Sequence, residues 1–303
     1  MIHGIINVYK EKGFTSHDVV AKMRGIVGQK KIGHTGTLDP DATGVLPVCL
    51  GKATKLCDLL TDKNKTYETV LLLGQTTDTQ DISGEVLTKS DTAHLKEEDV
   101  KNAIFSFVGE YDQIPPMYSA LKVNGKKLYE LAREGIEIER KARRVQILSI
   151  EIKEINLPRV RMEVSCSKGT YIRTLCHDIG QLLGCGACME TLIRTRVSRF
   201  ELAESLTLAQ IQEKKDAGIL DTILTPIDAM FASYPKVILK EEFAPLVYNG
   251  NSFLIKHVQE GGKYLEGDRV RVYDHAGEFI AVYQFIKEKA LFRVEKMFYE
   301  RKS

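Results

Sequence analysis

Residues 33–44, with the sequence GHTGTLDPDATG, are the most informative stretch of this chain, because they place one aspartate, Asp39, in a loop of unusual backbone composition. The three glycines accept backbone angles that other residues resist, and Pro40 restricts a further angle and removes an amide donor. The threonines can hydrogen-bond to nearby backbone groups. An apolar run, residues 45–50, follows directly. We therefore expect a shaped loop that is anchored on a buried element and presents Asp39.

An aspartate in such a loop is a candidate nucleophile, general base, metal ligand or turn former. Asp-Pro and Asp-x-Thr are also common in ordinary turns. Three glycines, three threonines, a histidine and two aspartates are more than a short connection needs, which favours a functional role. Residues 39–43 fit the DxDxT pattern of phosphatases that form an aspartyl phosphate. That nucleophile ends a hydrophobic strand, whereas residues 33–38 are mostly glycine or polar, so we reject this alternative.

Hydrophobic periodicity predicts the secondary structure around this loop. Residues 5–8 form a strand, and Ser16 is the N-cap of a helix that ends at Gly28. In the strand over residues 65–74, Tyr67 and Thr69 share one face. Further strands are predicted over residues 145–155, 160–166 and 191–200, and helices over 52–60, 97–108, 128–135, 171–183 and 208–215, with a tight turn at Asn124-Gly125. Without regular βαβ alternation, this pattern indicates an α+β fold on a largely antiparallel mixed sheet flanked by helices.

A domain boundary is expected between residues 230 and 236. From residue 234 onward, short apolar runs alternate with turn signals such as Asn249-Gly250 and Gly261-Gly262, which is typical of a small β-rich module. We therefore predict a catalytic domain over residues 1–233 and a second domain over residues 234–303.

Composition restricts the class of protein. A chain of 303 residues with 43% hydrophobic residues can build a substantial core. The formal net charge of +2 is too mild to indicate nucleic-acid binding, so local charge must be considered. Residues 122–144 contain eight Lys or Arg against four Glu. This segment is a candidate RNA-contacting surface, although a solvated helix face would show similar alternating charges.

No signal peptide or membrane-spanning run is recognisable, so we expect a cytoplasmic protein. The six cysteines are then expected to be reduced thiols. Cys185-Gly-Ala-Cys188 could be half of a zinc or redox site, but there is no second CxxC and no histidine pair at ligand spacing. Structural thiols are the expected interpretation, and no metal is predicted.

Residues 33–44 closely resemble the active-site motif of the TruB family of tRNA pseudouridine synthases. Five other motifs of that family occur in the same order and at similar spacing. They are Gly13-Phe14-Thr15-Ser16, residues 65–84 (KTYETVLLLGQTTDTQDISG), residues 113–135 (QIPPMYSALKVNGKKLYELAREG), residues 166–175 (CSKGTYIRTL) and residues 192–197 (LIRTRV). One difference is that the family usually has Lys-Pro before the first glycine motif, where this chain has Lys10-Glu11-Lys12-Gly13.

The resemblance implies a pseudouridine synthase fold followed by a PUA-like RNA-binding module, with an RNA-clamping insertion over residues 113–144. It also implies isomerisation of the uridine at position 55 in the T-loop of tRNA to pseudouridine. This rearrangement of one nucleotide needs no cofactor or metal. The expected partner is tRNA, through its T-arm, and we expect a monomer that needs no protein partner and no membrane.

Three catalytic residues are implied by position in the family motifs. Asp39 is the nucleophile or general base, and the atom that it attacks or deprotonates is left open. Arg173 is the arginine that pairs with this carboxylate, which would keep it ionised and oriented. Tyr67 is the aromatic residue that lies on the target base.

Three further residues are implied to contact the substrate. Leu192 corresponds to an apolar wall of the base pocket, and His34 to a histidine that helps to hold the opened T-loop. Lys122 is a candidate phosphate contact because of its charge and its location in the insertion.

Two other functions remain open at this stage. A guide-RNA-dependent synthase of the dyskerin type shares the loop and the terminal module, although the long insertion over residues 113–144 favours a stand-alone enzyme. The chain could also be a tRNA-folding chaperone in which catalysis is secondary.

Overall fold

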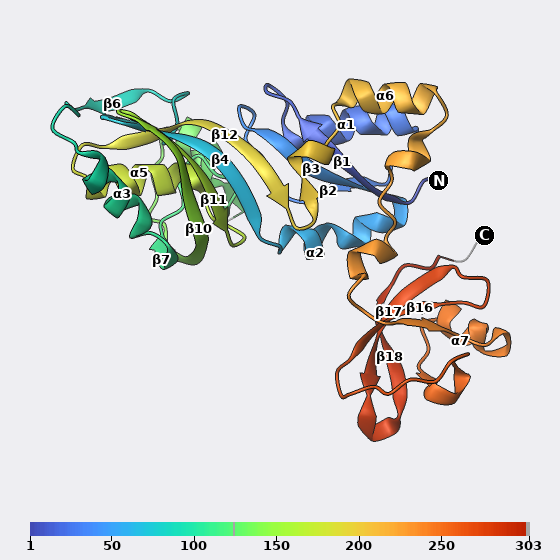
Figure 1. Ribbon diagram of the computed structural model, residues 1–303. Coiled ribbons are helices and arrows are strands. Elements are labelled where there is room, and N and C mark those ends of the chain that lie inside the picture. Colours follow the sequence, from blue (N-terminus) through green and yellow to red (C-terminus); the bar gives the residue numbers. More distant parts are fainter. Residues whose placement is uncertain (124, 301–303) are drawn as a thin grey trace.

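Two β-sheets organise the chain (Figure 1), and the computed structural model describes residues 1–123 and 125–300. In this part of the chain the larger sheet has nine strands, ordered β1-β3-β12-β4-β11-β10-β7, with β2 beside β3 and β13 beside β12. The strands are β1 (Gly4–Lys10), β2 (Ile32–His34), β3 (Thr43–Leu50), β4 (Lys65–Leu73), β7 (Gly109–Gln113), β10 (Arg143–Asn156), β11 (Arg159–Cys166), β12 (Ala187–Val197) and β13 (Phe200–Glu201). Among the described strands of this sheet, only β3 and β12 pair in parallel, which confirms the predicted α+β fold.

Helices lie on both sides of this sheet (Figure 1). They are α1 (Ser16–Val27), α2 (Cys57–Thr61), α3 (Glu97–Phe105), α5 (Ile172–Leu182) and α6 (Leu208–Asp216). Two other helices lie elsewhere: α4 (Leu128–Arg133) between β7 and β10, and α7 (Ala244–Tyr248) in the C-terminal lobe. On β1, Ile6 and Val8 pack under α1 and α6, whereas Ile5 points to the other side, against α2. Farther along the sheet, α3 and α5 cover the face that carries Tyr67 and Leu71. The alternation of side chains along each strand thus supplies separate cores on the two faces.

The start of α1 corrects one prediction. Thr15, and not Ser16, is the N-cap, because Thr15 has extended backbone angles and its side chain accepts a hydrogen bond from the amide of Asp18. The carboxylate of Asp18 accepts in return from the Thr15 amide, completing a capping box. Ser16 is already helical and fully buried, and its hydroxyl accepts a hydrogen bond from the Leu38 amide at 2.9 Å. It therefore ties α1 to the Asp39 loop.

Other boundaries also shift. The predicted helix over residues 52–60 is a 3₁₀ turn, Gly51–Leu56, followed by α2, and the strand expected from residue 191 begins at Ala187. The hairpin of β10 and β11 is present as predicted.

The segment between β7 and β10 leaves the sheet and returns to it at neighbouring residues. Gln113 at the end of β7 pairs with Arg143 at the start of β10. In between lie α4 and a small hairpin, β8 (Lys122–Val123) with β9 (Lys126–Lys127). The predicted tight turn at Asn124-Gly125 falls partly on Asn124, which lies outside the described residues, while Gly125 has φ of 86°. Residues 113–144 thus form an excursion from two paired strands, and their use as an RNA clamp remains a prediction.

A second sheet forms the C-terminal lobe, which is drawn in orange and red in Figure 1. Its order is β14-β16-β17-β18-β15, with β14 (Lys236–Ile238), β15 (Phe253–Leu254), β16 (Arg269–Tyr273), β17 (Phe279–Ile286) and β18 (Leu291–Met297). The lobe has its own core around Phe253, Tyr283 and Phe292. Val282 and Phe298 also pack with Ile5 and Leu56 of the first lobe. The β-rich module is confirmed, whereas its PUA identity and a boundary at residue 233 remain predictions.

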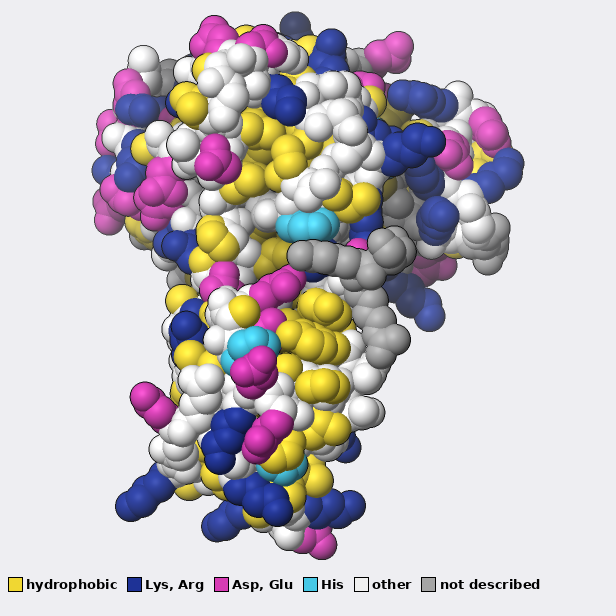
Figure 2. Space-filling view, turned by 90° about the vertical axis from the view of Figure 1, so that its right-hand side faces the viewer, with side chains coloured by type: hydrophobic (Ala, Val, Ile, Leu, Met, Phe, Trp, Pro, Cys, Tyr) yellow, Lys and Arg dark blue, Asp and Glu magenta, His cyan; other side chains and the backbone are white. Residues whose placement is uncertain are grey.

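On the face shown in Figure 2, Lys and Arg side chains are interspersed with Asp and Glu over both lobes. This mixture agrees with the small formal net charge of +2. In the part of the chain that the structure describes, no helix is long and apolar enough to cross a membrane.

Candidate active site

The Asp39 loop connects β2 to β3 and is held by its own backbone. The carbonyl of Asp39 accepts a hydrogen bond from the Ala42 amide at 3.1 Å, which closes a tight turn. Two glycines have angles that side chains rarely adopt, with φ of 114° at Gly36 and 105° at Gly44. A Cβ on Gly44 would lie 2.3 Å from the carbonyl oxygen of Arg194 on β12. Glycine is therefore required where β3 and β12 run side by side.

Asp39 and Arg173 form an ion pair. The distance between Oδ2 of Asp39 and Nη2 of Arg173 is 3.1 Å. The arginine side chain is 7% exposed and the aspartate side chain 45% exposed. The buried guanidinium therefore orients a carboxylate that is still accessible from solvent. Arg173 lies in the first turn of α5, where Gln113 receives a hydrogen bond from the Tyr171 amide and donates one to its carbonyl. Gln113 therefore fixes the start of the helix that carries the arginine.

The guanidinium of Arg173 has further partners, none of which was predicted. Its Nη1 lies 3.5 Å from Oδ2 of Asp81 and donates to the Thr79 carbonyl at 3.0 Å. Its Nη2 donates to the Tyr118 carbonyl at 2.8 Å. A planar guanidinium with donors in several directions can satisfy all these acceptors at once. Arg173 consequently joins the Asp39 loop to two other loops.

Tyr67 and Leu192 lie beside this pair on neighbouring strands. Tyr67 on β4 pairs with Arg194 on β12, and Leu192 pairs with Thr69. Because residues two apart on a strand share a face, Tyr67 and Thr69 point to the same side, as predicted. Tyr67 is 8% exposed, and burial raises the pKa of its phenol. Leu192 packs against the apolar cluster that contains Tyr67 and Leu38, next to Asp39 in the chain.

The other two predicted residues are placed differently. His34 ends β2, at the base of the Asp39 loop, and its ring meets that of His17 edge to face at 5.4 Å between centroids. Burial lowers the pKa of His34. Lys122 is exposed on β8 and makes no hydrogen bond or ion pair with Asp39 or Arg173 within residues 1–123 and 125–300. The structure thus gathers five of the six predicted residues around one loop and leaves Lys122 on the insertion.

Three functional candidates were missed by the sequence analysis. Asp81 lies in the quoted motif of residues 65–84, and an acidic residue in a glycine-bounded loop was the available signal. Arg194 lies in the motif of residues 192–197 and is fully buried, which its sequence neighbours do not indicate. Lys10 had no assigned role. It is fully buried, and its ammonium donates to the carbonyls of Ala42 at 2.6 Å and of Pro40 at 3.1 Å.

Burial of Lys10 lowers its pKa to about 8, while the nearby Asp39 carboxylate acts in the opposite direction. The ammonium lies under the turn that presents Asp39, so it contributes a positive potential at the carboxylate as well as hydrogen bonds to the loop.

No site for a metal is formed by the described residues. They contain no group of three or more His, Cys, Asp or Glu side chains that could hold an ion. All six cysteines are free, and Cys185 and Cys188 are buried. The structural interpretation of the CxxC pair remains a prediction.

Comparison with known proteins tests the predicted family. Residues 24–172 match the N-terminal domain of TruB family pseudouridylate synthases, and residues 173–232 match the C-terminal domain of tRNA pseudouridylate synthase B. The tRNA pseudouridine synthase B of Lachnoclostridium phytofermentans is 53% identical over 98% of this chain and all of the relative. That of Alkaliphilus oremlandii is 46% identical over 95% of this chain and all of the relative. This chain belongs to the TruB family of pseudouridylate synthases.

Two solved structures are similar to this TruB family member over nearly its full length. A chain in an H/ACA RNP bound to a substrate RNA containing 2'-deoxyuridine has a TM-score of 0.73 at 26% identity, covering 99% of this chain and 86% of the other. A chain of a Cbf5-Nop10-Gar1 complex has a TM-score of 0.72 at 29% identity, with the same coverage. Both are less similar in sequence than the bacterial relatives, which favours the stand-alone synthase over the guide-dependent alternative.

Proposed function

We propose that this TruB family enzyme isomerises the uridine at position 55 in the T-loop of tRNA to pseudouridine. The observation that carries the proposal is the ion pair of 3.1 Å between Asp39 and Arg173, with the carboxylate half exposed and the guanidinium buried. The near full-length similarity to proteins named tRNA pseudouridine synthase B supports tRNA as the substrate.

The target base must leave the stack, because its glycosidic bond and C5 are inaccessible in a folded T-arm. Flipping costs a few kcal/mol, which stacking and phosphate contacts offset. In this proposal the base lies on Tyr67 and against Leu192, while His34 helps to hold the opened loop. Lys122 contacts a phosphate from the insertion, and the C-terminal lobe adds a further RNA surface.

Asp39 then acts while the C–N bond breaks, the base turns and C5 bonds to the ribose. Attack on the base, attack on C1′ and removal of a sugar proton all require a correctly oriented carboxylate. In this proposal the Arg173 ion pair holds that orientation through the contact of 3.1 Å between Nη2 and Oδ2. The Tyr67 hydroxyl is proposed to assist loss of the C5 proton after reattachment.

The test is to incubate the protein with an unmodified tRNA transcript, without additives, and to map pseudouridine by position. Modification confined to position 55 is expected. A transcript with cytidine at that position controls for specificity. Modification elsewhere in the tRNA would keep the activity but reject the T-loop assignment, and an unmodified transcript would reject the proposal.

A folding-chaperone role coexisting with this chemistry would appear as refolding of misfolded tRNA by an inactive Asp39→Asn variant. We propose a monomer without a protein partner, which sedimentation of the active protein alone and with tRNA would test.

A further inference from the structure

Arg194 is a fully buried cation beside the active site (0% exposed). Its Nε donates to the Val45 carbonyl at 2.7 Å, its Nη2 to the Gly36 carbonyl at 3.2 Å and its Nη1 to the Thr37 carbonyl at 3.5 Å. Within residues 1–123 and 125–300 no ion pair involves Arg194, unlike Arg173 with its two carboxylates. Burying an unpaired charge is costly, and apolar packing of the same volume is often more stable. Stability alone therefore does not explain this residue.

The position of Arg194 links two parts of the proposed machinery. Gly36 and Thr37 precede Asp39 in the loop, and Val45 follows it in β3, so one guanidinium binds the loop on both sides of the aspartate. On β12, Arg194 is also directly opposite Tyr67 of β4. The side chains of two such cross-strand neighbours share a face of the sheet, and the charge of the guanidinium acts against the rise that burial causes in the pKa of the Tyr67 phenol.

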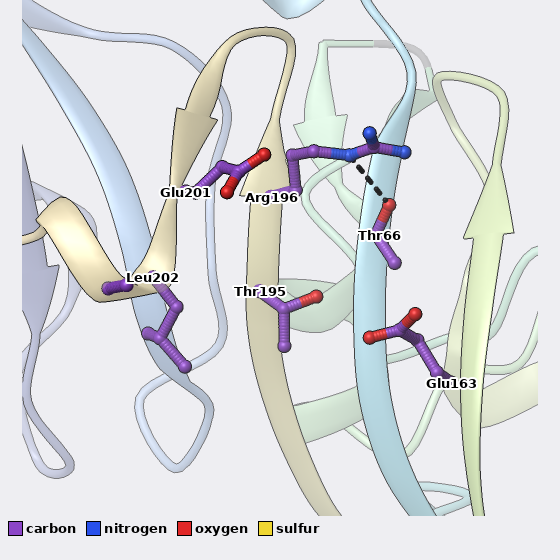
Figure 3. Close-up of a pocket in the computed structure, with 7 residues that line it drawn as sticks. Thr66, Glu163, Thr195, Arg196, Glu201 and Leu202 are labelled. Atoms are coloured by element: carbon purple, nitrogen blue, oxygen red, sulfur yellow. Dashed lines mark hydrogen bonds between the residues drawn. The ribbon is translucent and has the colours of Figure 1, made fainter.

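Register makes this placement specific to Arg194. The pairing of β12 with β4 shifts between Arg194 and Arg196, which leaves Thr195 as an extra residue in a β-bulge. Arg194 therefore pairs with Tyr67, and Arg196 with Thr66, which points to the opposite face of β4. Figure 3 shows Arg196 reaching toward Thr66 in a pocket on that face, with a hydrogen bond of 3.3 Å from its Nε to the threonine hydroxyl. The side chains of these two arginines of β12 thus lie on opposite faces of the sheet.

We infer that Arg194 is a positioning residue for the isomerisation, which holds the Tyr67 hydroxyl and the Asp39 loop in one geometry through a single buried guanidinium. This inference rests on the proposed function. Arg194 touches no substrate in this role and acts through Tyr67 and through the carbonyls of Gly36 and Thr37.

The test compares Arg194→Lys and Arg194→Met with the matched control Arg196→Met. Single-turnover pseudouridine formation, tRNA affinity and melting temperature are measured for each. With Arg194→Met we expect the rate at saturating tRNA to fall about 100-fold while affinity changes by less than about threefold. Arg194→Lys should recover part of the rate, and Arg196→Met should match the wild type. A folded Arg194→Met variant with a rate within about threefold of wild type overturns the inference.

A double-mutant cycle shows whether Arg194 acts through the phenol. In a Tyr67→Phe background the phenol oxygen is absent, so the fall in rate caused by Arg194→Met should be about tenfold smaller than in the wild type. The fall that remains reflects the lost hydrogen bonds to the loop carbonyls. An equal cost in both backgrounds overturns the link to Tyr67.

A second measurement needs no turnover. Fluorotyrosine placed at position 67 is titrated by its absorbance in the full-length protein, with Arg194 present and in the folded Arg194→Met variant. Because the guanidinium charge acts against the rise that burial causes in the pKa of the Tyr67 phenol, this phenol should ionise at a higher pH in the variant. Ionisation at the same pH in both proteins overturns the link to Tyr67. Failure of the wild type to modify tRNA would instead reject the proposed function and leave this titration valid.

Discussion

The Asp39 loop and the insertion over residues 113–144 are two excursions from the same sheet, and they are held in different ways. Buried side chains from three separate elements hold the loop by hydrogen bonds: Lys10 and Arg194 donate to its carbonyls, and Ser16 accepts from the Leu38 amide. The insertion is largely exposed, and its base is the pairing of Gln113 with Arg143. Side chains that must hold a reacting group need a rigid frame, whereas a binding surface can adapt to its partner. We therefore expect the loop to determine the rate and the insertion the affinity.

Arg173 links the two regions. The Tyr118 carbonyl in the insertion accepts from Arg173, which also pairs with Asp39. One guanidinium therefore connects the insertion with the carboxylate. The following four changes test the division between rate and affinity, from the largest expected effect to the smallest.

Asp39→Asn should abolish activity, by at least about a thousandfold, while tRNA affinity stays nearly intact. Asparagine keeps the shape and the backbone turn but loses the charge, so only interactions made in the transition state are removed. Single-turnover rates and filter binding measure the two quantities. Asp41→Asn is the matched control, because Asp41 is exposed on the same turn and pairs only loosely with Lys12, at 3.9 Å. Residual turnover within tenfold of wild type would remove Asp39 from its role.

Tyr67→Phe should lower the rate about 100-fold at unchanged affinity, because the ring still stacks and only the hydroxyl is lost. Tyr67→Leu removes both and should also weaken retention of the base, since base–aromatic stacking contributes about 1–3 kcal/mol. Following cleavage of the glycosidic bond separately from product formation distinguishes the steps. If Tyr67→Phe forms pseudouridine at close to the wild-type rate, only the stacking role survives.

Gly44→Ala should destabilise the fold by about 2–3 kcal/mol, because the new Cβ meets the Arg194 carbonyl in addition to the strain of the left-handed backbone. Gly109→Ala is the control, since its φ of 114° is similar to the 105° at Gly44 but its Cβ would meet no atom within 4 Å. Chemical denaturation gives the loss in the free energy of unfolding for both variants. The difference between the two losses measures the clash apart from the backbone strain. Equal losses would show that the approach of β12 does not restrict position 44.

Lys122→Ala should have the smallest effect, a loss of about threefold in tRNA affinity at an unchanged rate. A single exposed cation contributes little more than one released counterion, so the slope of log affinity against log salt should decrease by about one. The measurement is a binding titration at several salt concentrations. A change in rate at saturating tRNA, rather than in affinity, would contradict the assignment of the insertion to binding.

The strongest sequence predictions were those carried by motifs of several residues. The α+β class, the strand with Tyr67 and Thr69 on one face and the family membership are confirmed. The resemblance paired Arg173 with Asp39, and the structure places them 3.1 Å apart. Boundaries were less accurate. The N-cap moved from Ser16 to Thr15 because the serine hydroxyl has a partner in the Asp39 loop, which lies 22 positions away in the chain.

Local pattern therefore determined which elements form and which loop bears the chemistry, because periodicity, glycine and capping signals act over a few residues. Tertiary structure alone decided the roles of Lys10, Asp81 and Arg194, whose partners lie far away in the chain. Regular alternation would place Arg194 and Arg196 on the same face of β12. The bulge at Thr195 separates them, and a bulge is set by the register between two distant strands, which no local pattern specifies.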